Sequence, residues 1–221
     1  MSETTATSAA PESVILRHFA YRRLMSLFGV LPLGTFIVYH FYFHSFSHAG
    51  AAAYNERLDQ LYHQPFHIAL AVLTVYFPLL WHSVVGTLVT LQSRPNFLQF
   101  TFFRNWMYTL QRASAIGLAF FIPAHLIKAR FSRELFGPAG AWAHMHDAFV
   151  NNGAESILTD SVYVLGILGV AFHLANGLWN FAVDWGILVG PRAQKTGSWV
   201  SVALFLALGA MGFHAMTGFL K

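Results

Sequence analysis

The chain has no cysteine, and only nine of its 221 residues are Asp or Glu. Without cysteine it can form no disulfide, no zinc–thiolate site and no iron–sulfur cluster of its own. Charged residues make up 10% of the chain, against roughly 25% in an average soluble protein. The net charge of +4 is small and the basic residues are dispersed, so nothing indicates a nucleic-acid partner. So little charge cannot cover a water-soluble globule, which excludes an ordinary soluble domain.

Apolar residues make up 56% of the chain, and 22 of them are Phe. They gather in five long stretches in which Arg112 is the one charged side chain. Each stretch has at least the ~20 residues that a helix needs to cross ~30 Å of hydrocarbon. The alternating strands of a membrane barrel are absent. The sequence therefore predicts an all-α integral membrane bundle of five transmembrane helices, at residues 24–46, 66–91 and 105–127, between Asp160 and Asp184, and at residues 197–220.

The rest of the chain consists of a tail and short connections. Residues 1–13 have neither the basic start nor the apolar core of a signal peptide, so we expect a short disordered tail before one membrane domain at 14–221. The longest connection, from about residue 131 to 160, should form an outer cap with a short surface helix. Lys and Arg are more numerous at the helix ends that lie on the side of the N-terminus. The positive-inside rule therefore predicts a cytoplasmic N-terminus and an external C-terminus.

Histidine is unusually abundant, with twelve residues. Each of the first four predicted helices carries one His well inside the apolar stretch: His40, His82, His125 and His173. At 1.5 Å per residue, His82 and His173 lie roughly 16–18 Å from the inner boundary, whereas His40 and His125 lie roughly 25–31 Å from it. The four residues therefore fall at two depths, with two imidazoles at each.

Two imidazoles that face each other across a helical bundle are what a six-coordinate haem iron requires. Small residues on the same helix faces would leave room for a porphyrin, namely Gly86, Gly117, Gly169 and Gly177. A zinc or non-haem iron site would instead need carboxylates or thiolates, and the five stretches contain none. Taken singly, an intramembrane His could equally form a helix–helix hydrogen bond or a proton relay. Depth alone also leaves His214 open as an outer ligand.

Arg112 lies about 12 Å from the inner boundary of the third helix by helical rise. An unpaired guanidinium at that depth is expensive, so it should have a partner. A haem propionate at the inner level would be a good bidentate partner. The alternative is that the side chain extends toward the surface and pairs with Asp184.

Around these residues the chain resembles the single-chain cytochrome b subunits of succinate dehydrogenases and fumarate reductases that use menaquinone. The similar segments are YRRLMSLFGVLPLGTFIVYH, PLLWHSVVG, FTFFRNWMYTLQR and FHLANGLWNFAVDWGILVGPR. The resemblance implies a five-helix anchor with two b haems. It assigns His82 and His173 to the haem nearer the cytoplasm and His40 and His125 to the distal haem, and it makes His214 a non-ligand.

The resemblance also implies partners and a location. A flavoprotein subunit with FAD and an iron–sulfur subunit would bind on the cytoplasmic side of the cytoplasmic membrane. Electrons would pass between them and a quinone, which is menaquinone in this family. The chain would not act on succinate alone. Some fumarate-reducing relatives have a Glu for proton transfer where this chain has Ala171, so that proton route is not expected here. Polar residues near the distal haem could contact quinone, although we favour ordinary loop-end roles for them: His44, Asn55, Glu56, Asp59 and Tyr62.

Two other functions fit parts of the pattern. One is a cytochrome b anchor of another quinone-linked enzyme, such as a hydrogenase or formate dehydrogenase. The segment around His173 argues against it. The other is a haem-free transporter with His gates, but the paired halves typical of transporters are not visible.

Overall fold

The computed structural model describes residues 12–132, 140–151 and 153–221, and all the regular structure in these ranges is helical. The elements, in chain order, are α1 (Glu12–Val30), α2 (Pro32–His44), η1 (Ser45–Ala49), α3 (Ala51–Tyr62), α4 (His67–Ala71), η2 (Val72–Tyr76), α5 (Phe77–Leu91), α6 (Phe103–His125), η3 (Leu126–Phe131), α8 (Ala141–Val150), α9 (Ala154–Asp184), α10 (Pro191–Thr217) and η5 (Gly218–Leu220). Of the tail expected at 1–13, residues 1–11 lie outside the described residues, and Glu12 begins α1.

Within the described residues, five helical stretches are long and apolar enough to cross a membrane, which confirms the predicted fold class. They run over Phe19–Ala49, His67–Leu91, Phe103–Phe131, Ala154–Asp184 and Pro191–Leu220. Four of the five begin several residues earlier than the apolar stretches suggested, because polar residues and Arg extend the helices beyond the hydrocarbon.

Prolines shape the first three spans. α1 and α2 are separated by a turn at Leu31, just before Pro32. The one-turn π-helix η2 ends just before Pro78, and a second, η3, begins three residues after Pro123. Proline lacks an N–H and its ring clashes with the preceding turn, so a helix that continues through it kinks or widens locally. The π-turns keep each span continuous while they change its direction.

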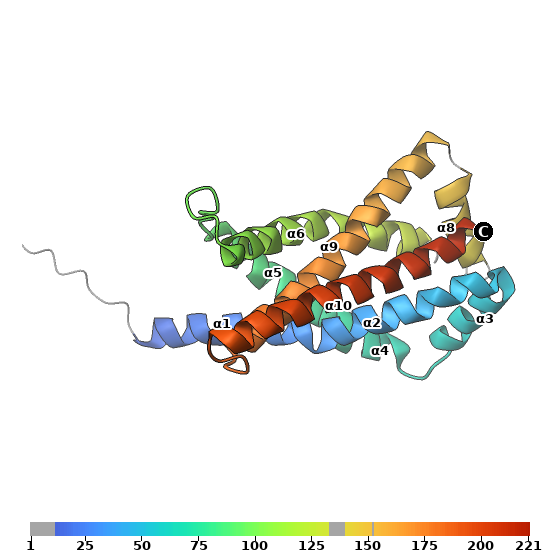
Figure 1. The fold of residues 1–221 in the computed structure, drawn as a ribbon. Helices are drawn as coiled ribbons and strands as arrows, with labels where there is room; N and C mark the ends of the chain where they lie inside the picture. Colours follow the sequence, from blue (N-terminus) through green and yellow to red (C-terminus); the bar gives the residue numbers. More distant parts are fainter. Residues whose placement is uncertain (1–11, 133–139, 152) are drawn as a thin grey trace, which may run out of the picture.

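α9 is the central helix of the bundle. It packs against α10, α6, α1 and α8, while α1 also packs on α5 and α2 packs on α10. Figure 1 shows the long helices running in roughly the same direction, with α1 beginning at one end and the C-terminus at the other. We call the end where α1 begins the inner end and the opposite end the outer end. An odd number of spans requires this separation.

Apolar side chains cover the flanks of the bundle. Phe120 is 76% exposed, Leu165 69% and Leu206 63%. In water, such a surface would drive aggregation. In a bilayer, the same side chains meet lipid tails, and the helices satisfy their own backbone hydrogen bonds.

The most densely packed region is the outer end, where η1, α3, α8 and η5 form a cap. Its buried core includes Tyr54, Phe149 and Phe219. The indole N–H of Trp142 donates to the carbonyl of Ser47 at 3.1 Å, which ties α8 to η1. The expected surface helix between residues 131 and 160 is thus present as α8. The helix α3 was not expected.

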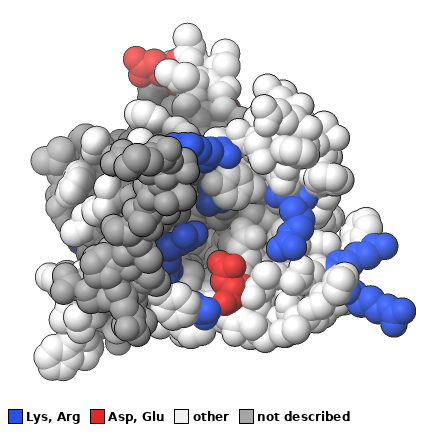
Figure 2. Space-filling view, turned by 90° about the vertical axis from the view of Figure 1, so that its left-hand side faces the viewer, with Lys and Arg blue, Asp and Glu red and all other residues white. Residues whose placement is uncertain are grey.

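The inner end carries a different surface. Basic side chains surround this end face, and acidic ones are few there (Figure 2). The guanidinium of Arg23 lies 4.8 Å over the ring of Trp185, whose indole N–H donates to the Ser26 hydroxyl at 3.1 Å. These contacts join the start of the chain to the turn between α9 and α10.

Candidate functional site

The structure brings together the two inner histidines from helices that are far apart in sequence. His82 lies on α5 and His173 on α9, and their ring centroids are 6.0 Å apart with the planes at 89°. Both imidazoles lie inside the apolar spans. Gly169 and Gly177 lie one turn before and one turn after His173 on the same helix face.

The two outer histidines also meet. His40 lies on α2 and His125 at the end of α6, and their ring centroids are 5.8 Å apart with the planes at 82°. Phe121 stacks on His125 at 5.5 Å, and His44 packs against His40 at 4.3 Å. The outer pair is therefore enclosed by other rings.

These distances can be compared with what one metal ion between two imidazoles requires. Histidine nitrogens bind metals at about 2.0 Å, so the centroids of two opposed imidazoles on one metal are roughly 6 Å apart. The observed 6.0 Å and 5.8 Å agree with this value. Each pair thus has the spacing for axial ligation of one iron.

The hydrogen bond at His82 fixes which nitrogen is available. Nδ1 of His82 lies 2.9 Å from the carbonyl oxygen of Met25. A carbonyl only accepts, so Nδ1 carries the proton and Nε2 presents its lone pair. Metal-bound histidines usually donate their other N–H in this way, which holds the ring and raises its basicity.

Gly29 makes this contact possible. It lies one turn after Met25 on α1, and an ideal Cβ at this position would be 2.5 Å from Cε1 and 2.7 Å from Nδ1 of His82. No side chain fits there without displacing the imidazole. Glycine at residue 29 therefore lets His82 lie directly on the backbone of α1.

His173 is held by a hydrogen-bond network from α6. The Ser114 hydroxyl is 3.1 Å from Nδ1 of His173 and donates its own proton to the carbonyl of Gln111 at 3.0 Å. The side-chain nitrogen of Gln111 also lies 3.3 Å from Nδ1 of His173, so these contacts hold the ring and are compatible with either tautomer. The Gln111 amide donates to the His173 carbonyl at 3.1 Å and accepts from Asn176 at 2.7 Å. Asn176 is only 2% exposed, so this end of the network is buried.

Tyrosine hydroxyls contact His125 and also His44, whose ring packs on His40. Nδ1 of His125 lies 3.2 Å from the hydroxyl of Tyr163 on α9. Nδ1 of His44 lies 2.7 Å from the hydroxyl of Tyr54 in the cap. A hydroxyl can donate or accept, so both contacts are compatible with either tautomer of the ring.

Arg112 does not form the ion pair with Asp184 that the sequence left open. Among the described residues the one ion pair joins His63 and Asp59. The Arg112 guanidinium lies 3.6 Å over the ring of Tyr108 and donates to the Tyr108 carbonyl at 3.4 Å. Its Nε is buried and has no hydrogen-bond partner. A buried donor without an acceptor is expensive, and an anionic group beside it would remove that cost.

His214 does not join the outer pair. Its ring stacks on His48 at 4.3 Å, and its carbonyl lies 2.7 Å from Nε2 of His48. These contacts give His214 a structural role at the outer end. The structure therefore pairs His40 with His125 and leaves His214 outside the pair.

The residues considered for quinone contact lie in α2 and α3 rather than in loops. The Asn55 side chain accepts from the Trp142 backbone at 3.2 Å, and Glu56 accepts from Gln60 at 3.3 Å. These are helix and cap contacts. His44 touches a member of the outer pair, His40.

The donor set fits haem better than a protein-only metal site. In the described ranges, no three or more His, Cys, Asp or Glu side chains converge as metal ligands. Zinc and non-haem iron usually take three or four protein ligands. A porphyrin supplies four nitrogens itself and needs only two axial ligands, and each pair provides two. The orphaned Arg112 Nε beside the inner level adds a partner for a propionate.

Fold and site together define an integral membrane protein of five spans with two transverse pairs of histidines. No protein-family model matches the chain. It is 34% identical over 203 residues to the succinate dehydrogenase cytochrome b558 subunit of Bacillus subtilis (strain 168), and the match covers 92% of this chain and 98% of that protein. The chain therefore belongs to the cytochrome b subunits of succinate dehydrogenases and fumarate reductases, the family that its sequence resembles.

Sequence reasoning missed the residues that orient the ligands. Met25 and Gly29 lie one turn apart in the segment before Pro32, but a backbone carbonyl has no signature in a sequence. Ser114 and Gln111 could have been suspected, because polar residues three apart inside an apolar span usually have a buried partner. Neither the partner helix nor the role of Tyr163 could be read from spacing.

Proposed function

We propose that this chain is the membrane anchor of a succinate:quinone oxidoreductase and holds two b haems, each between two histidines. The observation that supports this most is the pair of centroid distances, 6.0 Å for His82 with His173 and 5.8 Å for His40 with His125. The cytochrome b name of the Bacillus subtilis relative supports haem as the group that is held.

The chain's own residues position the group and set its surroundings. Met25 accepts the Nδ1 proton of His82, and Ser114 and Gln111 hold Nδ1 of His173, which would leave both Nε2 atoms for the inner haem. Arg112 would bind a propionate of that haem and place a positive charge beside it. The apolar spans exclude water from both sites. When bound, haem supplies a one-electron iron couple whose potential depends on axial ligands, hydrogen bonds and nearby charge.

In this assembly an FAD flavoprotein and an iron–sulfur subunit bind the inner end, on the cytoplasmic side of the cytoplasmic membrane. The excess of basic side chains at the inner end supports that orientation. The two pairs lie at different depths, so the haems form a path between the iron–sulfur subunit and quinone. The quinone is menaquinone, as the family resemblance implies, and electrons can run in either direction.

The test is single alanine substitution of each ligand in the full chain. His82→Ala and His173→Ala should each remove the inner haem and leave the outer one, and His40→Ala and His125→Ala should do the reverse. The haem-to-protein ratio and reduced-minus-oxidised spectra count and distinguish the two haems. His214→Ala is the matched control and should retain both.

Three results would overturn the proposal. One is a colourless protein from cells that are well supplied with haem. Another is loss of the outer haem alone on His82→Ala. The last is co-purification with a hydrogenase or formate dehydrogenase subunit in place of a flavoprotein and an iron–sulfur protein.

A further inference from the structure

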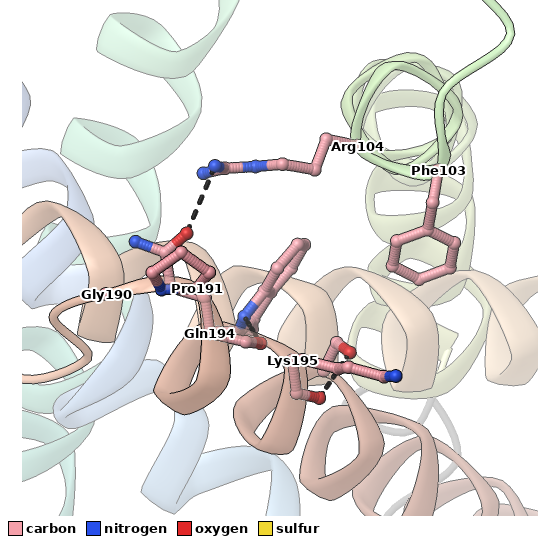
Figure 3. A pocket seen from close by; sticks show the side chains of 8 residues that line it. Phe103, Arg104, Gly190, Pro191, Gln194 and Lys195 are labelled. Carbon is pink, nitrogen blue, oxygen red and sulfur yellow. Dashed lines mark hydrogen bonds between the residues drawn. The ribbon is translucent and has the colours of Figure 1, made fainter.

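A cavity of about 400 Å³ opens at the inner end between the first turns of α6 and α10 (Figure 3). Trp179 on α9 forms part of its wall and is only 6% exposed. The other lining residues are Phe103, Arg104, Gly190, Pro191, Gln194, Lys195 and Ser198. The cavity contains no residue of either histidine pair.

The rim of the cavity is held by hydrogen bonds from three helices. Arg104 reaches across from α6 and donates to the Gln194 side chain at 3.1 Å (Figure 3). Trp179 donates its indole N–H to the Gln194 carbonyl at 3.0 Å. Gln194 is thus fixed through both its side chain and its backbone, and this fixes the position of the Arg104 guanidinium.

The cavity is positively charged. Arg104 and Lys195 both line it, and in the described part of the chain neither has a carboxylate within ion-pair distance. A guanidinium has five N–H donors, and the bond to Gln194 uses one. The Ser198 hydroxyl, one turn after Lys195, donates its proton to the Lys195 carbonyl at 2.7 Å, so the charged donors that line the cavity are the guanidinium and the ammonium. Both groups suit the oxygens of a phosphate group.

The depth of the cavity is that of the lipid headgroups. The spans that carry it begin at Phe103 and Pro191, and Ser198 lies seven residues into its span, or roughly 10 Å. The polar layer of a bilayer is roughly 5–7 Å thick on each side, so the cavity extends from that layer to the edge of the hydrocarbon. Neighbouring aromatic side chains face outward, with Phe102 70% and Trp199 67% exposed. Such aromatic residues are typical of the membrane interface.

We propose that this cavity binds the phosphodiester headgroup of an anionic glycerophospholipid, with the Arg104 guanidinium as the main donor to the phosphate and Lys195 as a second positive charge in the wall. The charge favours a phosphate over a neutral quinone ring. The lateral position among exposed aromatic residues favours a lipid over an acidic segment of a partner subunit. The proposal does not depend on haem binding or on the identity of the partner enzyme.

The experiment is native mass spectrometry of the full chain, purified in neutral detergent and mixed with equal amounts of dioleoyl phosphatidylglycerol and dioleoyl phosphatidylcholine. Two basic residues near a membrane surface should give phosphatidylglycerol about a thirtyfold advantage in retention. The double variant Arg104→Gln, Lys195→Gln should bind the two lipids nearly equally. The matched control is Arg57→Gln, Arg94→Gln, which loses the same charge outside the cavity and should keep the preference.

Further arms separate the alternatives. Arg104→Lys preserves the charge and should keep most of the preference, and its unfolding temperature shows whether the rim is intact. Equal retention of both lipids by the unmodified chain would overturn the proposal, as would loss of the preference in the control. Displacement of phosphatidylglycerol by millimolar inorganic phosphate would show a site for the free anion. Loss of a co-purified partner subunit in the double variant, with lipid binding unchanged, would assign the cavity to that partner.

Discussion

Replacing Gly29 by alanine should selectively impair the inner haem. The added Cβ would lie 2.5 Å from Cε1 of His82, whereas ordinary carbon contacts are roughly 3.5–4.0 Å. The ring must therefore retreat by about 1 Å. Its bond to the Met25 carbonyl, now 2.9 Å, would then exceed hydrogen-bonding distance. Overpacking lowers the free energy of unfolding by roughly 1–3 kcal/mol and the lost hydrogen bond by about 1 kcal/mol. The higher helix propensity of alanine offsets about 1 kcal/mol of this loss.

Loss of a hydrogen bond that orients a metal ligand typically lowers metal affinity 10–100-fold. We therefore expect Gly29→Ala protein to be purified with substoichiometric inner haem and a full complement of outer haem. The assay is a haem-to-protein ratio combined with a redox titration that resolves the two components. Gly209→Ala on α10 is the control, because a Cβ there has no neighbour within 4 Å. Two fully occupied haems with unchanged potentials in Gly29→Ala would refute the role assigned to the Met25 contact.

Three further substitutions test the surroundings of the two sites. Ser114→Ala removes a hydrogen-bond partner of Nδ1 of His173. With haem bound through Nε2, Nδ1 carries a proton that Ser114 would accept, so its loss weakens electron donation by the imidazole and the inner potential should rise by roughly tens of millivolts, whereas a fall would contradict this. Arg112→Gln removes a positive charge that favours the reduced iron, so the inner potential should fall by a similar amount in the same titration. In Gly166→Ala the new Cβ collides with the ring of Phe121, which stacks on the outer ligand, so only the outer haem should change its low-spin signal in electron paramagnetic resonance.

Composition and periodicity were sufficient to predict the five spans, because lipid imposes one rule on every residue of a crossing helix. The span boundaries were less accurate. Charged and polar residues such as Arg104 and Gln194 continue a helix beyond the hydrocarbon, and no compositional change marks the point where it begins. Helix α3 was missed for the same reason, since Glu56 and Asp59 read as loop residues but lie on the polar side of a surface helix.

The sequence was sufficient to predict how deep each histidine lies along its helix. It could not predict the direction in which the side chain points around the helix axis. Counting residues from the nearest charge placed His82 level with His173, and the structure brings these two rings to 6.0 Å. The same counting could not separate His214 from His40 and His125. Its exclusion depends on the direction in which α10 turns that side chain, and this direction is fixed by packing against η1.

The orienting hydrogen bonds explain why the two sites depend on one bundle. His173 on α9 is held by Ser114 on α6, and His125 on α6 is held by Tyr163 on α9. Each of these helices therefore orients a ligand of the other, at different depths. His82 depends instead on α1, through Met25. A shift of α6 along α9 must therefore reach both pairs, whereas a local change at one side chain, or a change in the α1–α5 contact, reaches only one. Independent occupancy of the two haems is thus expected only for substitutions that leave the positions of α6 and α9 relative to each other unchanged.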